Sequence, residues 1–314
     1  MQLPASLRAR MEDLLEGVST HDLSYHYQLL SDRYRRQSEA ASLQIRNEQE
    51  ALAYMASRLP ATYGAVADVC RRLRALWPEF EPQHLLDLGA GPGTATLAAL
   101  EIWSSLQTLT LVEPNPYLRK IAEDLIPEKI IVEPAALATR TPHKADLVLL
   151  SYVLNELPPA EIATEIDRIW PDVVTALVVI EPGTPLGFQT IHTVREKLLS
   201  LGAELAAPCP HMLACPLNAT DRWCHFSVRI DRPSFHRRVK GDASLGHEDE
   251  KFSYVVATRI SLPKPAARII GHPHGSKLIE LELCEKDGHA ATRVFSKRDP
   301  LYKAAKKSAW GDGL

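Results

Sequence analysis

The stretch that decides the fold is residues 84–94, His-Leu-Leu-Asp-Leu-Gly-Ala-Gly-Pro-Gly-Thr. The apolar run Leu85–Leu88 is followed by three glycines and then by a helical pattern, so the stretch predicts a strand, a tight turn and a helix. Glycines let the backbone pass close to a ligand, and the helix N-terminus attracts the electronegative end of whatever binds there. A dinucleotide turn has the spacing Gly-x-Gly-x-x-Gly, and here the third glycine comes one residue early. The spacing therefore favours S-adenosylmethionine over NAD.

Short apolar runs and longer helical patterns alternate from this stretch onward. The strand candidates are Leu85–Leu88, Leu109–Val112, Ile130–Val132, Leu147–Leu150 and Leu177–Ile180. The helix candidates are Thr94–Leu106, Pro116–Leu125, Pro159–Trp170 and Leu186–Leu201. Such alternation predicts parallel βαβ units. We therefore expect an α/β fold of the class I S-adenosylmethionine-dependent methyltransferase type, which is Rossmann-like and doubly wound.

The flanking sequence predicts two additions to this domain. Helical spacing at Leu7–Leu15, Leu23–Tyr54 and Gly64–Leu76, broken at Pro60 and Pro78, indicates a helical N-terminal region over residues 1–82. A methyltransferase-like domain would cover 83–260, with a cysteine-rich insertion at 206–228 and an antiparallel strand near Phe252–Ile260. A small basic, β-rich extension over 261–314 would hold a strand at Lys277–Glu285 and a helix at Pro300–Ala309.

Six residues are predicted to bind the cofactor, and they are Asp87, Gly89, Gly91, Gly93, Glu113 and Ser151. Glu113 ends the second strand about 20 residues after the glycines, where an acidic side chain accepts hydrogen bonds from the ribose hydroxyls. Asp87 would face the amino group of the methionine part, and Ser151 would line the crevice at the end of the fourth strand. The alternative is a relic of the fold that binds no nucleotide.

Asn155 is the candidate catalytic residue. An enzyme that methylates an exocyclic amine typically carries Asn- or Asp-Pro-Pro-aromatic after the fourth strand, and this chain has Asn155 and Glu156 there without that tetrapeptide. The alternative is that Asn155 and Glu156 cap the helix starting at Pro158, since Asn satisfies free N–H groups at a helix entrance. Glu181, at the end of the fifth strand, could also reach the pocket.

Four of the five cysteines, Cys209, Cys215, Cys224 and Cys284, fall in the last third of the chain. Thiolates gathered in a reducing compartment usually bind a metal, but no Cys-x-x-Cys zinc knuckle is present. The spacing leaves an iron–sulfur cluster, zinc and unligated cysteines all open, with His211 and His225 as replacement ligands. A radical enzyme would need Cys-x-x-x-Cys-x-x-Cys, so any cluster is expected to be structural or sensory. Cys70 has the apolar spacing of a core residue.

Charge and composition narrow the function classes. Residues 1–208 carry 18 Lys and Arg against 27 Asp and Glu, whereas residues 209–314 carry 18 against 12, so the two parts have net charges of −9 and +6. A basic part of this kind is typical of a polyanion binder, although a solvated surface gives the same count. No apolar run is long enough to span a membrane, and Met1–Gly17 lacks an apolar signal core, so we expect a cytoplasmic protein.

Several motifs in order resemble one known family, the methyltransferase-like proteins of small-ribosomal-subunit assembly. The motifs are Arg58–Tyr63, Leu86–Thr94, Glu113–Asn115, Ser151–Leu157, Glu181–Pro185, Pro208–His211, Cys215-Pro216, Trp223–Phe226 and Glu248–Tyr254. The resemblance covers roughly residues 40–300. It implies a protein that acts on the small ribosomal subunit and its rRNA, and a 4Fe-4S cluster on Cys209, Cys215, Cys224 and Cys284.

Three functions compete at this stage. The first is an RNA methyltransferase in which Asn155 orients the base, and the second is a non-catalytic assembly factor whose RNA-binding surface is braced by the cluster. A small-molecule methyltransferase is a weaker third, because the basic part and the extension argue against it. We expect a monomer when the protein is free, and a bacterial-type member because the start of the chain shows no mitochondrial presequence.

Overall fold

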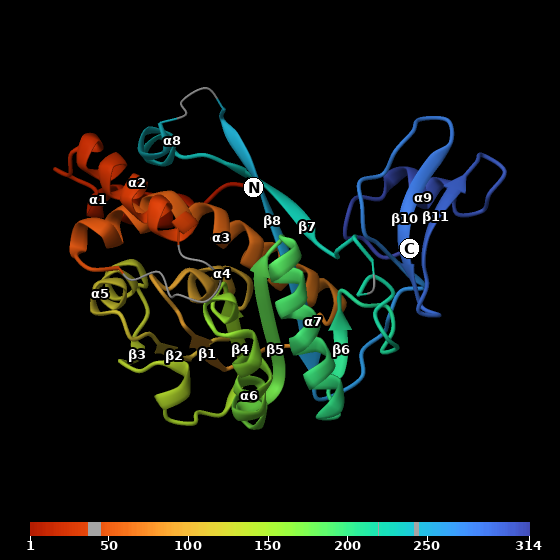
Figure 1. The fold of residues 1–314 in the computed structure, drawn as a ribbon, viewed down its shortest axis with the longest axis horizontal. Coiled ribbons are helices and arrows are strands. Elements are labelled where there is room, and N and C mark those ends of the chain that lie inside the picture. The colour runs from red at the N-terminus through yellow and green to blue at the C-terminus, as the bar shows by residue number, and fades with distance from the viewer. Residues whose placement is uncertain (37–44, 219, 242–244) are drawn as a thin grey trace.

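The computed structural model of the protein describes residues 1–36, 45–218, 220–241 and 245–314. Strands and helices alternate from β1 to α7 as predicted (Figure 1). The helices are α1 (Ala5–Leu14), α2 (Thr20–Arg36), α3 (Glu48–Leu76), α4 (Thr94–Ile102), α5 (Pro116–Leu125), α6 (Pro159–Ile169), α7 (Pro185–Ser200), α8 (Ser234–Lys240) and α9 (Tyr302–Lys307). The strands are β1 (His84–Leu88), β2 (Thr108–Val112), β3 (Ile130–Glu133), β4 (Ala145–Ser151), β5 (Val173–Pro182), β6 (Glu204–Ala207), β7 (Phe226–Asp231), β8 (His247–Thr258), β9 (Ala267–Ile269), β10 (Ile279–Glu285) and β11 (Ala290–Phe295).

The main sheet has the strand order β3-β2-β1-β4-β5-β8-β6. Strands β1 to β5 are parallel, and β8 is inserted antiparallel between β5 and β6. Strand β8 is long enough to pair with β7 through its first half and with β5 through its second (Figure 1). The predicted class I methyltransferase fold, including its antiparallel strand near residue 252, is confirmed.

The register brings the carboxyl ends of three strands into one row. Leu88 at the end of β1 lies opposite Val112 of β2 on one side and Leu150 of β4 on the other. The residues that follow these strands therefore meet at one edge of the sheet, where ligands bind in open α/β folds.

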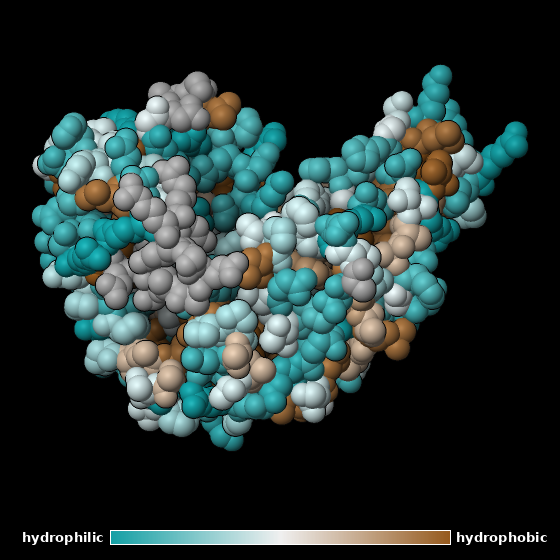
Figure 2. Space-filling model, in the orientation of Figure 1, coloured by the Kyte–Doolittle hydropathy of each residue, from teal (hydrophilic) through white to brown (hydrophobic). Residues whose placement is uncertain are grey.

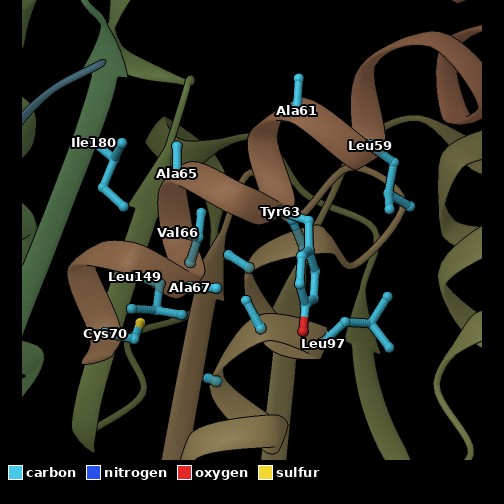
Figure 3. Close-up of a cluster of buried hydrophobic side chains, with 14 of the residues drawn as sticks. Leu59, Ala61, Tyr63, Ala65, Val66, Ala67, Cys70, Leu97, Leu149 and Ile180 are labelled. Atoms are coloured by element: carbon cyan, nitrogen blue, oxygen red, sulfur yellow. The ribbon is translucent and has the colours of Figure 1, made fainter. Parts of the chain in front are cut away.

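Each face of the sheet is covered by helices. On one face, Tyr63 and Val66 of α3 pack with Leu97 of α4 against Leu149 and Ile180 of the strands (Figure 3). On the other face, α6 and α7 cover the alternate strand positions, such as Leu150 and Val179. Because both faces are covered, the parallel strands are continuously apolar, which is why the sequence displays them as short runs. Cys70 is fully buried on α3, as predicted.

Helix α3 continues through Pro60, so the predicted break there is wrong. A proline costs a helix one backbone hydrogen bond, but tertiary packing can outweigh that cost. Nearly the whole of α3 is buried between α2, α4 and the sheet, and nearby hydroxyls add bonds to helix carbonyls, from Ser57 to Ala53 at 2.7 Å and from Thr62 to Arg58 at 3.1 Å. The predicted break at Pro78 is confirmed, since α3 ends at Leu76. Part of the predicted helix Leu23–Tyr54 lies outside the described residues.

The C-terminal part forms its own small sheet, β9-β10-β11, which projects from the main body (Figures 1 and 2). Ile269, Leu281 and Phe295 form its core with Tyr302 of α9. The short elements β6, β7, α8, β9 and β11 were not predicted. The limits 1–82, 83–260 and 261–314 stay a prediction, and α1 to α3 share one hydrophobic core with the sheet. Among the described residues, no helix is both long and apolar enough to cross a membrane.

Candidate functional site

The carboxyl ends of β1, β2 and β4 surround a cavity of about 560 Å³. Ligand pockets typically enclose about 300–1,000 Å³, so this cavity can hold a nucleotide-sized molecule. It brings together five of the six predicted cofactor residues, namely Asp87, Gly89, Gly91, Glu113 and Ser151. Gly93 and the catalytic candidate Asn155 are not among its lining residues.

The glycine turn leaves room where a ligand would pass. Gly91 has φ +55°, and a Cβ built on it would meet no heavy atom within 4 Å, so its open side faces the cavity. A Cβ on Gly89, by contrast, would collide with the side chain of Val153. Gly93 is the N-cap of α4 with φ +78°, and a Cβ there would approach Ile126 at 2.7 Å. Gly91 thus opens the cavity, whereas Gly93 allows close packing behind it.

Glu113 is held in place by the turn that it faces. Its Oε2 accepts the N–H of Gly91 and its Oε1 accepts the N–H of Asn115, both at 2.8 Å. The side chain is 7% exposed, and this burial raises the pKa of Glu113 although the two N–H groups oppose the rise. A carboxylate oxygen can accept further hydrogen bonds, so Glu113 is oriented for hydroxyl groups in the cavity.

Asp87 anchors the start of α4 from within the sheet. Its Oδ2 accepts the N–H of Thr96 at 3.0 Å and the Thr96 hydroxyl at 2.7 Å. Burial raises the pKa of Asp87 to about 6. The residue lines the cavity, but part of its hydrogen-bonding capacity is used to hold the helix.

The wall after β4 has a strained backbone. Tyr152 has φ +61° in the described structure, a left-handed conformation that is costly for a bulky residue and is common at functional sites. Its Oη donates to Glu250 Oε1 of β8 at 3.0 Å, and Glu250 in turn faces Arg58 of α3 at 3.5 Å. The strain therefore directs the Tyr152 ring along the cavity wall, between β4 and β8.

Asn155 lies in a short 3-10 turn, Leu154–Glu156, and its buried Oδ1 has no hydrogen-bond partner among the described residues. The alternative capping role is not what the structure shows, because α6 begins at Pro159 after the N-cap Pro158 and no side chain caps it.

Helix α3 supplies a wall that the sequence did not indicate. Tyr54 and Thr62 of α3 line the cavity, together with Ile45 and Arg46 just before it. Thr62 lies within the motif Arg58–Tyr63, but no role was assigned to it, and the other three residues belong to no motif, since most of this helix is buried and has the pattern of a core helix. Only the fold brings them to the glycine turn.

A second cavity collects all four predicted metal ligands. Cys209, Cys215 and Cys224 reach it from the loop between β6 and β7, and Cys284 reaches it from β10. Cys215, Cys224 and Cys284 also belong to one apolar cluster around Phe188, Leu217 and Ile270. Cys209 and Cys284, which are 75 residues apart in the sequence, thus line the same cavity in the fold.

Burial disfavours the thiolate form of two of these cysteines, Cys224 and Cys284. Burial, followed by the neighbouring thiols Cys209 and Cys215, raises the pKa of Cys284 to about 12 and that of Cys224 well above its usual value. Among the described residues, no three His, Cys, Asp or Glu side chains converge closely enough to hold a single metal ion.

Of the two histidine candidates, only His211 lines the cysteine cavity. Its Nε2 lies 3.4 Å from the Cys284 sulfur, and burial lowers the pKa of His211. His225 instead bonds the Trp223 carbonyl through Nδ1 at 3.2 Å and stacks on the Trp223 ring.

Fold and cavity together define a class I methyltransferase-like protein with a nucleotide-sized pocket. Residues 48–314 match the family described as mitochondrial small ribosomal subunit Rsm22, and the chain belongs to this family. The resemblance to the methyltransferase-like proteins of small-ribosomal-subunit assembly is thereby confirmed.

Two mitochondrial relatives agree with this assignment, and the solved structures named after them are more distant. The human ribosome assembly protein METTL17, mitochondrial, is 30% identical over 98% of this chain and 69% of its own length. The Rsm22-cox11 tandem protein 2, mitochondrial, of Schizosaccharomyces pombe is 26% identical over 86% of this chain, which spans 44% of that protein. Magnesium protoporphyrin IX methyltransferase from Synechocystis PCC 6803 is 14% identical, with TM-score 0.43 over 82% of this chain and 98% of that one. The plantazolicin methyltransferase BpumL is 8% identical, with TM-score 0.42 over 77% and 98%.

These comparisons correct one prediction. The expectation of a cytoplasmic protein is wrong, because the matched family is described as mitochondrial and the matched relatives are mitochondrial proteins. The start of the sequence was a poor guide, since an absent apolar signal core excludes only one kind of targeting.

Proposed function

We propose that this chain binds S-adenosylmethionine and acts, as a methyltransferase-like protein, on the small ribosomal subunit and its rRNA during assembly. The observation that carries the proposal is the cavity at the glycine turn, where the open side of Gly91 and the oriented carboxylate of Glu113 meet. Membership of the Rsm22 family and the name of the human relative, a ribosome assembly protein, support the ribosomal role.

The residues fit the cofactor in a simple way. Glu113 would accept the ribose hydroxyls, the open side of Gly91 would let the methionine part pass close to the backbone, and Asp87 would face its amino group. When bound, S-adenosylmethionine supplies an electrophilic methyl group. Tyr152 and the α3 residues Tyr54 and Thr62 would then bound the space left for a substrate.

Replacement of Gly91 by arginine tests the pocket. The arginine would fill the open side of the turn, so calorimetry should detect no binding of S-adenosylmethionine to Gly91→Arg. The matched control is Gly202→Arg, because Gly202 also has positive φ and open space around it but lies in the turn after α7. Unchanged binding to Gly91→Arg would rule out this pocket.

A transfer assay separates an enzyme from a binding factor. Small subunits from a strain lacking the gene should take up tritium from labelled cofactor if the protein is a methyltransferase. Bound cofactor without transfer would instead identify a non-catalytic assembly factor that uses the same fold.

We further propose a 4Fe-4S cluster held by Cys209, Cys215, Cys224 and Cys284, with zinc as the alternative. All four line one cavity, and burial disfavours the thiolates of Cys224 and Cys284 unless a cation is present. A cluster of several irons spans more space than a single zinc ion, whose four sulfurs would stand about 2.3 Å from it. Either occupant needs cysteines from separate elements around one cavity, and here they come from the β6–β7 loop and from β10.

Metal analysis distinguishes the two. Anaerobically purified protein should contain iron and acid-labile sulfide and absorb in the visible range, and serine at any of the four positions should reduce the iron. The control is Cys70→Ala, because Cys70 is buried in the α3 core outside the cavity. Stoichiometric zinc without iron would reject the cluster.

The RNA contact is proposed to involve the basic C-terminal part. The exposed cations Lys303, Lys306 and Lys307 lie on α9, which belongs to the projecting part of the molecule (Figure 1). Replacing all three with glutamine should reduce the slope of log affinity against log salt by about 2 for single-stranded RNA. A control replaces three exposed lysines of the main domain, Lys120, Lys129 and Lys144. We propose that the free protein is a monomer, which light scattering on the purified protein would test.

A further inference from the structure

Arg195 is a buried arginine in the wall of the cysteine cavity. It lies on α7, is 3% exposed, and lines the cavity with the four cysteines. A buried guanidinium is costly unless negative charge and hydrogen-bond acceptors surround it. Its partners therefore indicate what the site is built to hold.

The partners present compensate Arg195 only in part. Nη2 donates to the Leu213 carbonyl at 2.6 Å, and Nη1 pairs with Glu196, whose side chain is 47% exposed to solvent. Nε is buried and has no hydrogen-bond partner among the described residues. The guanidinium shares the cavity wall with Cys209.

A second arginine faces the same cavity from the other side. Arg268 of β9 donates from Nε to the Pro208 carbonyl at 2.8 Å and from Nη1 to the Gly311 carbonyl at 2.9 Å. Both acceptors are neutral, so they leave its charge uncompensated. The described lining contains these two arginines and no Asp or Glu.

The positive charges in the lining of this cavity therefore favour an anionic group. Four thiolates around an iron–sulfur core carry a net negative charge, which increases when the cluster takes up an electron. A fixed positive charge beside the sulfurs stabilises the bound cluster, and it stabilises the reduced form more than the oxidised one.

We propose that Arg195 is a positioning residue of the cysteine centre, which fixes the 209–215 segment through the Leu213 carbonyl and sets the centre's reduction potential through its charge. This inference rests on the iron–sulfur centre proposed above. It assigns a role to a residue that no cysteine motif includes.

Two variants separate charge from hydrogen bonding. Arg195→Gln keeps an N–H donor for the Leu213 carbonyl but loses the charge, whereas Arg195→Lys keeps the charge. The control is Arg259→Gln, which removes one positive charge from an arginine that also donates to carbonyl oxygens, those of Val173 and Trp170, but lies outside the cavity.

Each protein is reconstituted anaerobically, its iron and sulfide are measured, and its midpoint potential is determined by titration followed in the visible spectrum. Arg195→Gln should shift the one-electron reduction equilibrium about tenfold toward the oxidised form, or about 59 mV lower, while Arg195→Lys and Arg259→Gln stay near wild type. Equal potentials and iron contents in wild type and Arg195→Gln would overturn the inference, as would equal shifts in the Gln and Lys variants.

Failure of the centre itself is a separate result. If the wild-type protein takes up no iron, the proposed cluster is wrong and Arg195 has no such role. If Arg195→Gln does not fold, as judged by circular dichroism, Arg268→Gln replaces it, since loss of that charge from the same cavity must lower the potential in the same direction.

Discussion

Glu181 offers a quantitative test of how the structure holds the segment after β4, residues 152–156. It lies near the end of β5 and is 0% exposed. Its Oε1 accepts the N–H of Val153 at 3.2 Å and that of Leu154 at 2.8 Å, while Oε2 is buried without a partner among the described residues. Burial raises the pKa of Glu181 from 4.5 to about 8, although the backbone N–H groups oppose the rise.

The sign of the pH effect follows from these two pKa values. Between pH 4.5 and about 8 the unfolded chain has released the Glu181 proton and the folded chain still holds it. The contribution of Glu181 to the free energy of unfolding is therefore fully present below pH 4.5 and is lost as the pH rises toward about 8. At about 1.4 kcal/mol per pH unit, the loss by neutral pH is about 3 kcal/mol.

The variant Glu181→Gln removes the titration and keeps an oxygen for Val153 and Leu154. Urea unfolding of both proteins, measured between about pH 5 and about pH 8.5, gives the difference in unfolding free energy at each pH. We expect the unfolding free energy of Glu181→Gln to increase relative to that of the wild type as the pH rises, by about 3 kcal/mol near neutrality. Asp87 and the other carboxyl groups are common to both proteins, so they cancel in the difference.

A leucine at the same position provides the contrast. Glu181→Leu leaves the Val153 and Leu154 N–H groups without their acceptor, which should cost about 1–3 kcal/mol even at low pH. A difference between wild type and Glu181→Gln that does not change with pH would refute the reasoning, because it would mean that the folded carboxyl titrates like the unfolded one.

Two further predictions concern buried charges. Thr96→Val removes the hydroxyl that donates to Asp87 and should destabilise the protein by about 1–3 kcal/mol. The loss should be larger at about pH 8 than at about pH 5, because the hydroxyl stabilises the ionised carboxylate of Asp87. Thermal unfolding at both pH values measures the difference. Arg140→Leu breaks a buried ion pair with Asp172 at 2.6 Å and should cost about 3–5 kcal/mol in urea unfolding. The double variant with Asp172→Leu should recover most of that loss, and a double variant as unstable as the single one would contradict this account.

The sequence predicted the main sheet because its strands are buried on both faces. Runs such as Leu85–Leu88 and Leu147–Leu150 have no polar interruption, and each is followed by a helical pattern, so their type and order were readable. The predicted helix break at Pro60 was wrong because it considered only the local backbone. Packing along the length of α3 stabilises the helix through that proline.

The cavity at the glycine turn could be predicted from the sequence where the residue type and the local backbone pattern point to the same place. Gly91 and Glu113 belong to a turn and a strand end whose roles follow from local spacing. Tyr54 and Thr62 were missed because nothing in a buried helix distinguishes a cavity-lining face from a packed one. Asn155 was chosen for its chemical type, but type alone did not place its side chain, which lies outside the cavity lining.

The cysteines show the limit of spacing rules most clearly. A knuckle puts two thiolates on one turn, so it can be read from sequence, whereas here the fourth cysteine comes from β10 and reaches the others only through the tertiary fold. Arg195 and Arg268 could not be predicted as neighbours of the cysteines for the same reason. Their positions in the sequence do not show that they line the same cavity.

The end of β5 is bonded both to the cysteine loop and to the wall of the cavity at the glycine turn. Trp223, in the cysteine loop, donates from Nε1 to the Gly183 carbonyl at 3.0 Å, and the Gly183 N–H donates to Lys251 of β8 at 2.9 Å. Two residues earlier, Glu181 bonds the N–H of Val153, which lines the cofactor cavity. Because one short segment bonds both the cysteine loop and Val153, we expect a shift of the cysteine loop to alter the wall that Val153 forms. Cofactor affinities of variants at either cavity therefore have to be compared at the same iron content, since a change in the loop would otherwise be read as a change in the pocket.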